Sequence, residues 1–276
     1  MGIEVIVIVL IIVILFIYLY WELTTLDVTN YKIKNEKLPK EFNGYKIAHI
    51  SDFHNTKSNK LKKNILKSLL KNRPDILAIT GDFIDSRRTN MNISLEFIKQ
   101  VKDIPIYYVA GNHESRIKDY PKFKKELTKL GITVLENEKV TLKNRKETIE
   151  LIGLQDPSFE TGELNSEQMK KIVDNYLKSL VSKSFNVVLL HRPELMEVLV
   201  KNNIDVAFHG HAHGGQIIIP FIGPIIAPNQ GFFPKFTSGV HEQNKTSVVI
   251  SRGIGNSLCP IRINNHPELI YVTLNK

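Results

Sequence analysis

The chain begins with an unbroken run of apolar residues. Residues 5–21 carry no charged side chain, and as an α-helix they would be about 25 Å long at about 1.5 Å per residue. A helix that spans a bilayer needs about 20 mostly apolar residues, which the flanking Ile3 and Leu23 help to supply. Tyr18 and Tyr20 lie near the end of the run, where aromatic rings favour the membrane interface. The pattern predicts a membrane-spanning helix.

Two other readings of this run fit less well. A cleaved signal peptide has a basic start and small residues at its cleavage site, whereas Glu4 precedes the run and residues 21–25 offer no Ala-x-Ala. A core helix of a globular domain would show a polar face, which this run lacks. We therefore predict an uncleaved N-terminal membrane anchor at residues 1–30 and a single-pass protein of the cell membrane.

Lysines after the anchor bear on its orientation. No Lys or Arg precedes the run, and Lys32, Lys34, Lys37 and Lys40 follow it. The positive-inside rule would place the rest of the chain in the cytoplasm. Because even Lys32 lies well beyond the apolar run, the side of the membrane stays open.

Beyond residue 32, short apolar runs of strand length alternate with amphipathic patterns of helix length. The predicted strands are residues 46–50, 75–79, 104–109, 186–190 and 204–208, and the predicted helices are residues 60–70, 93–101, 121–130, 166–180 and 193–200. Strands separated by helices of this length are typical of βαβ units.

The other segments read as β-structure or loop. Further strands are predicted at residues 139–142, 148–154, 216–219, 246–251 and 268–274, the first two as a hairpin. We expect a polar loop at residues 156–167 to separate two halves of the fold, and Ser166 to cap the helix that follows it.

Composition narrows the class of protein. The 276 residues are 42% hydrophobic and 24% charged, which excludes a disordered chain, a collagen-like repeat and a polytopic membrane protein. The formal net charge of +9 suits anionic lipid headgroups or nucleic acid, or has no functional meaning. Cys259 is the single cysteine, so an intrachain disulfide and a Cys-based zinc site are excluded.

Side chains that can bind metals follow five of the predicted strands. They are Asp52, His54, Asp82, Asn112, His191, His211 and His213, and His113 comes directly after Asn112. Ligands bind at the carboxyl ends of strands in open α/β sheets, and carboxylate with imidazole suits divalent ions such as Mn²⁺, Fe²⁺ and Zn²⁺. Two such ions about 3.5–4 Å apart can activate water and hold phosphate oxygens. A single Asp or His at a strand end is commonly structural, but that reading does not explain the whole ordered set.

This ordered set resembles the pattern of the calcineurin-like metallophosphoesterase superfamily, D-x-H, G-D, G-N-H-[ED], H and G-H-x-H. All five motifs are present between residues 52 and 213. Residues 213–216 and 251–255, with Pro260-x-Arg262, resemble the membrane-anchored bacterial phosphodiesterase branch. The resemblance implies that residues 31–276 form a metallophosphoesterase domain. Its fold would be an α/β four-layer sandwich of two mixed β-sheets flanked by helices.

The resemblance also implies residue roles. Two divalent metal ions (Mn²⁺, Fe²⁺ or Zn²⁺) would bind, the first to Asp52, His54, Asp82 and His213, and the second to Asp82, Asn112, His191 and His211. His113 would donate a hydrogen bond to the phosphate or protonate the leaving group, and Glu114 would orient His113. The remaining histidines and Cys259 are interpreted as structural or surface residues.

The expected activity is hydrolysis of a phosphodiester or pyrophosphate bond by a metal-activated water, on a lipid-linked or cell-envelope substrate. Residues 217–236 are apolar, and form either a rim that faces the bilayer or a buried strand with a packed loop. The alternatives are a phosphomonoesterase, a nuclease and a non-catalytic membrane-tethered metal-binding scaffold. A nuclease is disfavoured because no basic and aromatic stripe flanks the motifs. No protein partner is inferred.

Overall fold

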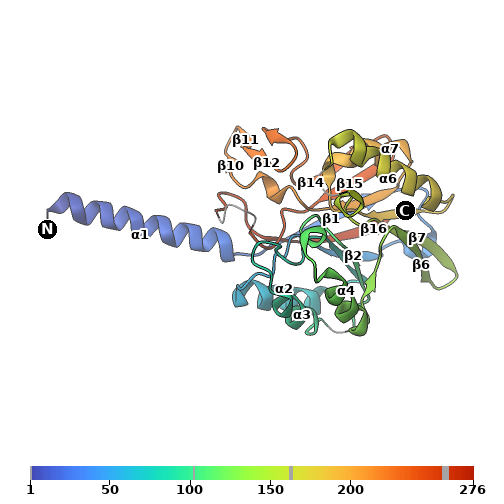
Figure 1. Ribbon diagram of the computed structural model, residues 1–276, viewed down its shortest axis with the longest axis horizontal. Coiled ribbons are helices and arrows are strands. Elements are labelled where there is room, and N and C mark those ends of the chain that lie inside the picture. Colours follow the sequence, from blue (N-terminus) through green and yellow to red (C-terminus); the bar gives the residue numbers. More distant parts are fainter. Residues whose placement is uncertain (1, 102, 162–163, 257–260) are drawn as a thin grey trace.

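Two six-stranded β-sheets lie face to face, with helices on the outer face of each, in the computed structural model of the chain (Figure 1). The structure describes residues 2–101, 103–161, 164–256 and 261–276. Each sheet contains both parallel and antiparallel pairs. The predicted α/β four-layer sandwich is therefore confirmed.

The first sheet contains the predicted βαβ units. Its strand order is β1 (Asp27–Lys34), β16 (Glu268–Asn275), β2 (Lys46–Ile50), β3 (Ile76–Thr80), β4 (Ile106–Val109) and β5 (Thr133–Val134). The last four strands are parallel and are joined by α2 (Asn59–Asn72), α3 (Met91–Ile98) and α4 (Tyr120–Lys129). β16 pairs in parallel with β1 and antiparallel with β2.

The second sheet has the order β14 (Gly239–Gln243), β15 (Thr246–Ile250), β9 (Val206–His209), β8 (Asn186–Leu189), β7 (Glu147–Gly153) and β6 (Glu138–Asn144). α5 (Ser158–Thr161) and α6 (Ser166–Leu180) connect β7 to β8, and α7 (Met196–Lys201) connects β8 to β9. The loop at residues 156–167 therefore does not separate two halves, because β7 and β8 are neighbours in one sheet. The chain passes from the first sheet to the second between β5 and β6.

Three hydrophobic cores hold the layers together. One fills the space between the sheets and includes Ile76 and Ala78 of β3 with Val187 and Phe208 of the second sheet. The alternate residues of β3 face the opposite way, into the core beneath α2, α3 and α4. A third core joins the second sheet to α6 and α7. This period of two is the expected result of a sheet covered on both faces.

α6 begins at Ser166, although Ser166 was predicted to be the cap that precedes the helix. The Asn165 side chain accepts the Gln168 backbone N–H at 2.9 Å, and the Gln168 side chain accepts the Asn165 N–H at 3.0 Å. Ser166 is the first helical residue, so its prediction as the cap is wrong. Asparagine caps helices as well as serine does, and glutamine three residues later completes the reciprocal pair.

α1 (Ile3–Thr24) projects from the body as a solitary helix (Figure 1). It is long and apolar enough to cross a membrane, and the most apolar 18-residue window is wholly exposed. Only Thr25 and Leu26 separate it from β1, a strand that the sequence pattern did not predict. β1 thus begins within the segment predicted as the anchor.

Shorter elements complete the structure. They are the 3₁₀ turns Lys40–Phe42, Glu114–Arg116, Pro193–Leu195 and His213–Gly215, and the two-residue strands β10 (Ile218–Ile219), β11 (Gly223–Pro224), β12 (Ile226–Ala227) and β13 (Gly231–Phe232). β10 pairs with β11 and β12 with β13, so residues 218–232 form two small hairpins.

Candidate metal centre

All eight side chains predicted at the strand ends meet at one edge of the double sheet. They follow the carboxyl ends of β2, β3 and β4 in the first sheet and of β8 and β9 in the second. All eight residues are buried. Because the sheets pack face to face, motifs about 160 residues apart come within contact distance, as the 3.3 Å between His54 Nε2 and His213 Nε2 shows.

Three of these residues form a first potential metal site. One ligand atom each of Asp52, His54 and His213 lies within 4.8 Å of the other two. His213 Nε2 is 3.2 Å from Asp52 Oδ1, and His54 Nε2 is 3.9 Å from the same oxygen. Two imidazole nitrogens and a carboxylate oxygen converging in this way form a donor set for a divalent ion.

A second potential site lies beside the first. Asp82, His191 and His211 likewise bring one ligand atom each within 4.8 Å. Asp82 Oδ2 is 3.3 Å from His191 Nε2 and 3.7 Å from His54 Nε2, so this carboxylate lies between the two groups. Its other oxygen accepts the backbone N–H of His113 at 2.9 Å. Asp82 is thus placed to bridge two ions.

Asn112 provides the observation that tests whether ions fit here. Its Oδ1 is buried and has no hydrogen-bond partner among the described residues. An unpaired buried amide oxygen costs about 1–3 kcal/mol, unless a ligand satisfies it. A carbonyl oxygen next to the second group is a suitable donor for a divalent ion. The His/Asp clusters of this centre can bind two metal ions, and the donor set does not decide which metal.

The protonation states of three histidines in the two groups also suit metal binding. Burial lowers the pKa of His54 to about 3 and holds the pKa of His211 and His213 well below the ordinary value, so these rings are neutral and keep a free lone pair. Burial also acts against the charged form of His191, but the carboxylates of Asp82 and Asp52 outweigh it and raise its pKa to about 10. Without metal, an imidazolium thus balances the buried carboxylates.

Glycines allow the strand ends to approach one another closely. A Cβ at Gly111 would overlap Asp82 Oδ1, and a Cβ at Gly210 would overlap Asp52 Oδ2 and Ser51 Oγ. Hence the carboxylates lie directly against the backbone of neighbouring strand ends. Any side chain at these two positions would displace them.

His113 lies beside the potential metal sites with a defined tautomer. Its Nδ1 accepts the Ser86 backbone N–H at 3.0 Å, so the proton is on Nε2, which is 3.8 Å from Asp82 Oδ2. Burial lowers the pKa of His113, which keeps the ring neutral near pH 7. The ring therefore presents an N–H donor to this region.

The group that orients His113 differs from the prediction, because it is the Ser86 backbone N–H and not Glu114. Asp85 Oδ1 is 3.3 Å from His113 Nδ1, on the same side as Ser86. Glu114 instead accepts the backbone N–H groups of Asp82, Ile84 and Gly111 at 2.8–3.0 Å. Glu114 thus ties two strand ends together. Asp85 was missed because it follows the Gly-Asp motif on a loop, where periodicity gives no signal.

A cavity of about 210 Å³ opens onto the centre. Among its lining residues are three arginines that the sequence analysis did not single out, Arg87, Arg116 and Arg192. Arg192 is fixed by Asp156 through contacts of 2.7 and 3.2 Å, and Arg87 is paired with Asp85 at 3.1 Å. Arg116 is exposed and has no side-chain partner among the described residues. The cavity therefore carries positive charge suited to an anionic ligand.

The other histidines lie outside the centre. His49 and His209 are buried within strands, and His241 and His266 are partly buried. Arg262 is fully buried and donates to the carbonyls of Gly253 and Gly255, which supports the turn behind Asp52. Cys259, predicted to pack beside Pro260, lies outside the described residues.

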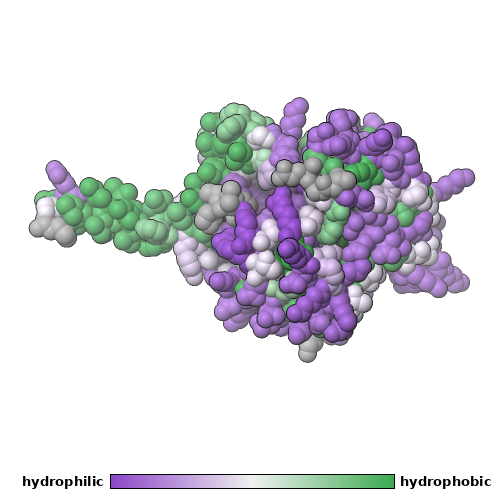
Figure 2. Space-filling model, viewed as in Figure 1, coloured by the Kyte–Doolittle hydropathy of each residue, from purple (hydrophilic) through white to green (hydrophobic). Residues whose placement is uncertain are grey.

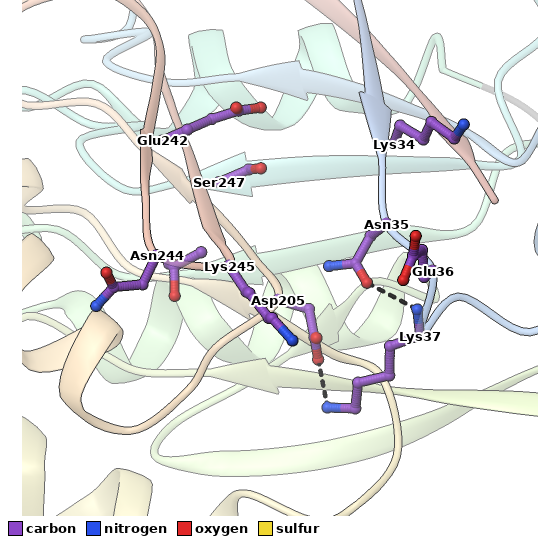
Figure 3. Close-up of a pocket in the computed structure, with 10 residues that line it drawn as sticks. Lys34, Asn35, Glu36, Lys37, Asp205, Glu242, Asn244, Lys245 and Ser247 are labelled. Atoms are coloured by element: carbon purple, nitrogen blue, oxygen red, sulfur yellow. Dashed lines mark hydrogen bonds and ion pairs between the residues drawn. The ribbon is translucent and has the colours of Figure 1, made fainter.

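A larger cavity, of about 500 Å³, lies at the opposite edge of the sheets (Figure 3). Asp205, directly before β9, lines it together with Lys34 at the end of β1 and Lys245 next to β15. Its charges are mixed, and Lys37 Nζ pairs with Asp205 at 2.7 Å. It brings together no cluster of metal-binding side chains among the residues described, so the smaller cavity is the candidate active site.

Comparisons with known proteins agree with this geometry. A family model described as Calcineurin-like phosphoesterase matches residues 45–215. The uncharacterized metallophosphoesterase YkuE of Bacillus subtilis is 28% identical over 267 residues, which cover 92% of this chain and 87% of that protein. Phosphodiesterase YaeI of Escherichia coli is 24% identical, over 83% of this chain and 82% of that protein. A Danio rerio relative named Transmembrane protein with metallophosphoesterase domain is 26% identical, over 90% of this chain and 57% of that protein.

Proposed function

The chain belongs to the calcineurin-like phosphoesterase family, and on that premise we propose that it is a membrane-anchored hydrolase of phosphodiester or pyrophosphate bonds. The observation that carries the proposal is the position of Asp82, which lies between two groups of metal-binding side chains and beside an N–H donor on His113.

In this proposal each group of side chains holds one divalent ion. Asp52, His54 and His213 would bind the first ion, His191, His211 and Asn112 would bind the second, and Asp82 would contribute to both. When bound, the two ions would supply the Lewis acidity that activates water and neutralises charge on the phosphate. Burial keeps three of the four histidine ligands deprotonated, so that ion binding needs no release of protons from His54, His211 or His213.

His113 is the proposed catalytic residue. With its proton on Nε2 and its pKa lowered by burial, it donates a hydrogen bond to a phosphoryl or leaving-group oxygen and remains neutral. This favours hydrogen-bond donation over full proton transfer, the two roles that the sequence left open. The Ser86 backbone N–H keeps the ring in this orientation.

The substrate is an anionic ester that fits a cavity with three arginines. A relative named Phosphodiesterase supports diester cleavage. The anchor formed by α1, with the catalytic domain at residues 31–276, supports a lipid-linked or cell-envelope substrate, because a tethered domain meets such esters at high effective concentration. The apolar helix and a relative with a transmembrane name support membrane attachment.

Hydrolysis of bis(p-nitrophenyl) phosphate and p-nitrophenyl phosphate by the full chain in detergent, with and without Mn²⁺, tests the proposal. We expect metal-dependent cleavage with the diester preferred, and a fall of about 10²–10⁴-fold in kcat for His113→Ala. Elemental analysis should find the same metal content in both proteins, because His113 is not among the proposed ligands. Arg145→Ala, on an exposed turn, is the matched control.

Two results would contradict the proposal. Turnover that survives in His113→Ala would remove the proposed donor role. Two bound metals without turnover on either ester or on a long-chain diester would favour the non-catalytic scaffold.

A further inference from the structure

The two hairpins at residues 218–232 expose aromatic side chains to solvent. Phe221 is fully exposed, Phe232 is 73% exposed and Phe233 is 65% exposed, with Ile222 beside them. The sequence left open whether residues 217–236 form a rim that faces the bilayer or a buried strand with a packed loop. The exposure of these four side chains contradicts the packed loop at their positions. Clustered exposed apolar residues of this size mark an interaction surface. We call these four residues the hairpin tips.

The backbone at the tips adds to this observation. Phe221 has a φ of 68° and Phe233 a φ of 52°, in the left-handed region where glycine or asparagine is usual. Bulky residues in this region are strained and are concentrated at functional sites. The turns thus hold two rings outward at a conformational cost that a glycine would avoid.

The same segment also forms a wall of the candidate active site. Pro228 and Asn229 line the cavity, between β12 and β13. Asn229 Nδ2 lies 3.2 Å from His211 Nε2 and donates to Glu194 Oε1 at 3.1 Å. Exposed rings and active-site lining are therefore only a few residues apart on one short piece of chain.

The end of α1 is joined to this region by buried hydrogen bonds. The Glu22 carboxylate is buried and accepts the backbone N–H groups of Asn264 and Asn265 at 3.0 and 3.1 Å. Asn265 Nδ2 in turn donates to the carbonyls of His213 and Gln216 at 2.7 and 3.1 Å. His213 belongs to the metal centre, and Gln216 leads into the hairpins. Helix, metal centre and hairpins are thus linked through two side chains.

The arrangement places the tips toward the membrane. α1 leaves the body at the end where the hairpins lie, and Figure 2 shows their apolar surface at the same end as the apolar helix. Its 22 residues give a helix about 33 Å long, enough for a hydrocarbon core of about 30 Å. With only Thr25 and Leu26 before β1, this end of the body stays close to the bilayer surface.

We propose that the hairpin tips are a second membrane contact, inserted into the bilayer interface beside α1, so that the cavity opens onto the lipid surface. The inference rests on the proposed membrane anchor. Aromatic rings favour the interface, and the exposed Lys235 next to the tips suits anionic headgroups. A phosphate ester held in the bilayer by its lipid chain would then reach Asn229 and the arginines without leaving the membrane.

Spin-label depth measurements on the full chain test this contact. The chain carries Cys259→Ser and a single new cysteine, and is placed in nanodiscs of three parts phosphatidylcholine to one part phosphatidylglycerol. Phe232→Cys reports the tips, and Leu70→Cys, on the exposed side of α2 and 71% exposed, is the matched control. We expect the label at position 232 to collide with oxygen and to be shielded from aqueous nickel chelate, and the label at position 70 to show the reverse.

Activity provides a second measurement. We expect Phe232→Ser with Phe233→Ser to lower hydrolysis of hexadecyl p-nitrophenyl phosphate in the nanodisc by about tenfold and to leave methyl p-nitrophenyl phosphate unchanged. Leu70→Ser should change neither. An equal loss on both esters would overturn the proposed contact.

The outcomes separate this contact from the proposed function. A label at position 232 that is open to the aqueous chelate overturns the contact, although the anchor stands. Shielding from both reagents would mean that a second copy or another protein covers the tips, and it also overturns the contact. A lipid-exposed label in a protein that cleaves no phosphate ester supports the contact and refutes the hydrolase. A chain that does not remain with the nanodisc refutes the anchor and the contact together.

Discussion

Five residues of the metal centre have left-handed backbone conformations. They are Asp52, His54, Asp82, His211 and His213, with φ between 45° and 66°. A left-handed conformation costs an L-residue about 1–2 kcal/mol relative to the right-handed one, because its Cβ crowds the following carbonyl oxygen. The centre is therefore held together against local strain by the packing of the two sheets.

The strain can be measured at His54. Both His54→Ala and His54→Gly remove the ring, but only glycine is relaxed at a φ of 45°. We expect His54→Gly to be more stable than His54→Ala by about 1 kcal/mol in chemical unfolding of the metal-free protein. The matched pair is His191→Gly and His191→Ala. His191 has no positive φ, so there the alanine variant should be the more stable one. If the alanine variant is the more stable one at both positions, the prediction of backbone strain at His54 is wrong.

His49 makes stability depend on pH. Burial, helped by the nearby His209, lowers the pKa of His49 to about 3, and its Nε2 is 2.7 Å from Thr80 Oγ1. In the unfolded chain the pKa is about 6.5. Between these values the unfolded state binds a proton that the folded state does not, so the free energy of unfolding falls as the pH falls.

Replacement of His49 should reduce this acid sensitivity. Between pH 4 and pH 6 the free energy of unfolding of His49→Leu should depend less on pH than that of the wild-type chain. We expect the two slopes against pH to differ by about 1.4 kcal/mol per pH unit. Urea unfolding of the metal-free proteins at three pH values measures the two slopes. Equal slopes would mean that the folded protein can protonate His49.

At the scale of elements, α6 shows what a local interaction contributes. Its N-terminus depends on the reciprocal bonds of Asn165 and Gln168. We expect Asn165→Ala to lower the free energy of unfolding by about 1 kcal/mol, and Ser166→Ala to change it by a few tenths. Phosphoesterase activity should be unchanged in both, because α6 lies outside the centre. If Ser166→Ala lowered the free energy of unfolding more than Asn165→Ala does, Ser166 and not Asn165 would be the helix cap.

Burial explains which elements the sequence revealed. β2, β3, β8 and β9 are covered on both faces and therefore appear as apolar runs at the predicted places. β1 lies at the edge of its sheet, and within it only Ile33 is buried, so it gives no apolar run. The hairpins at residues 218–232 have two-residue strands, which are too short for any periodicity.

The site was predictable to the extent that it follows strands. The eight side chains come directly after apolar runs, so their common edge could be inferred. Asp85 and Asn229 belong to loops and Arg116 to a 3₁₀ turn, whose positions depend on tertiary packing, and no local pattern indicates them. The placement of Glu22 against residues from the other end of the chain was equally hidden.

At the scale of the whole molecule, the joint between α1 and the body depends on Glu22. Its carboxylate accepts two backbone N–H groups, and Trp21 packs edge-on against His266 with ring centroids 4.4 Å apart. Without the carboxylate, the backbone N–H groups of Asn264 and Asn265 lose their partner, and the loss at the buried Asn265 costs about 1–3 kcal/mol. The helix would then be held to the body by the covalent link, by the Trp21–His266 ring contact and by the 3.4 Å contact between Lys60 Nζ and Thr24 Oγ1.

Hydrogen exchange of the full chain in nanodiscs can detect this loss. We expect Glu22→Ala to speed exchange at Asn264 and Asn265 by about tenfold or more, while peptides from α6 exchange as before. Glu4→Ala, near the other end of α1, should leave the exchange of both amides unchanged. Unchanged protection in Glu22→Ala would show that other contacts hold the joint.

The position of β16 determines when the first sheet can be completed during synthesis. β16 lies between β1 and β2, although it is made more than 200 residues after them. At about 5–20 residues per second, the ribosome adds that stretch over tens of seconds. Throughout this time the two early strands lack the neighbour that joins them. The nascent chain therefore has a first sheet in which β1 and β2 are not joined until β16 emerges from the ribosome.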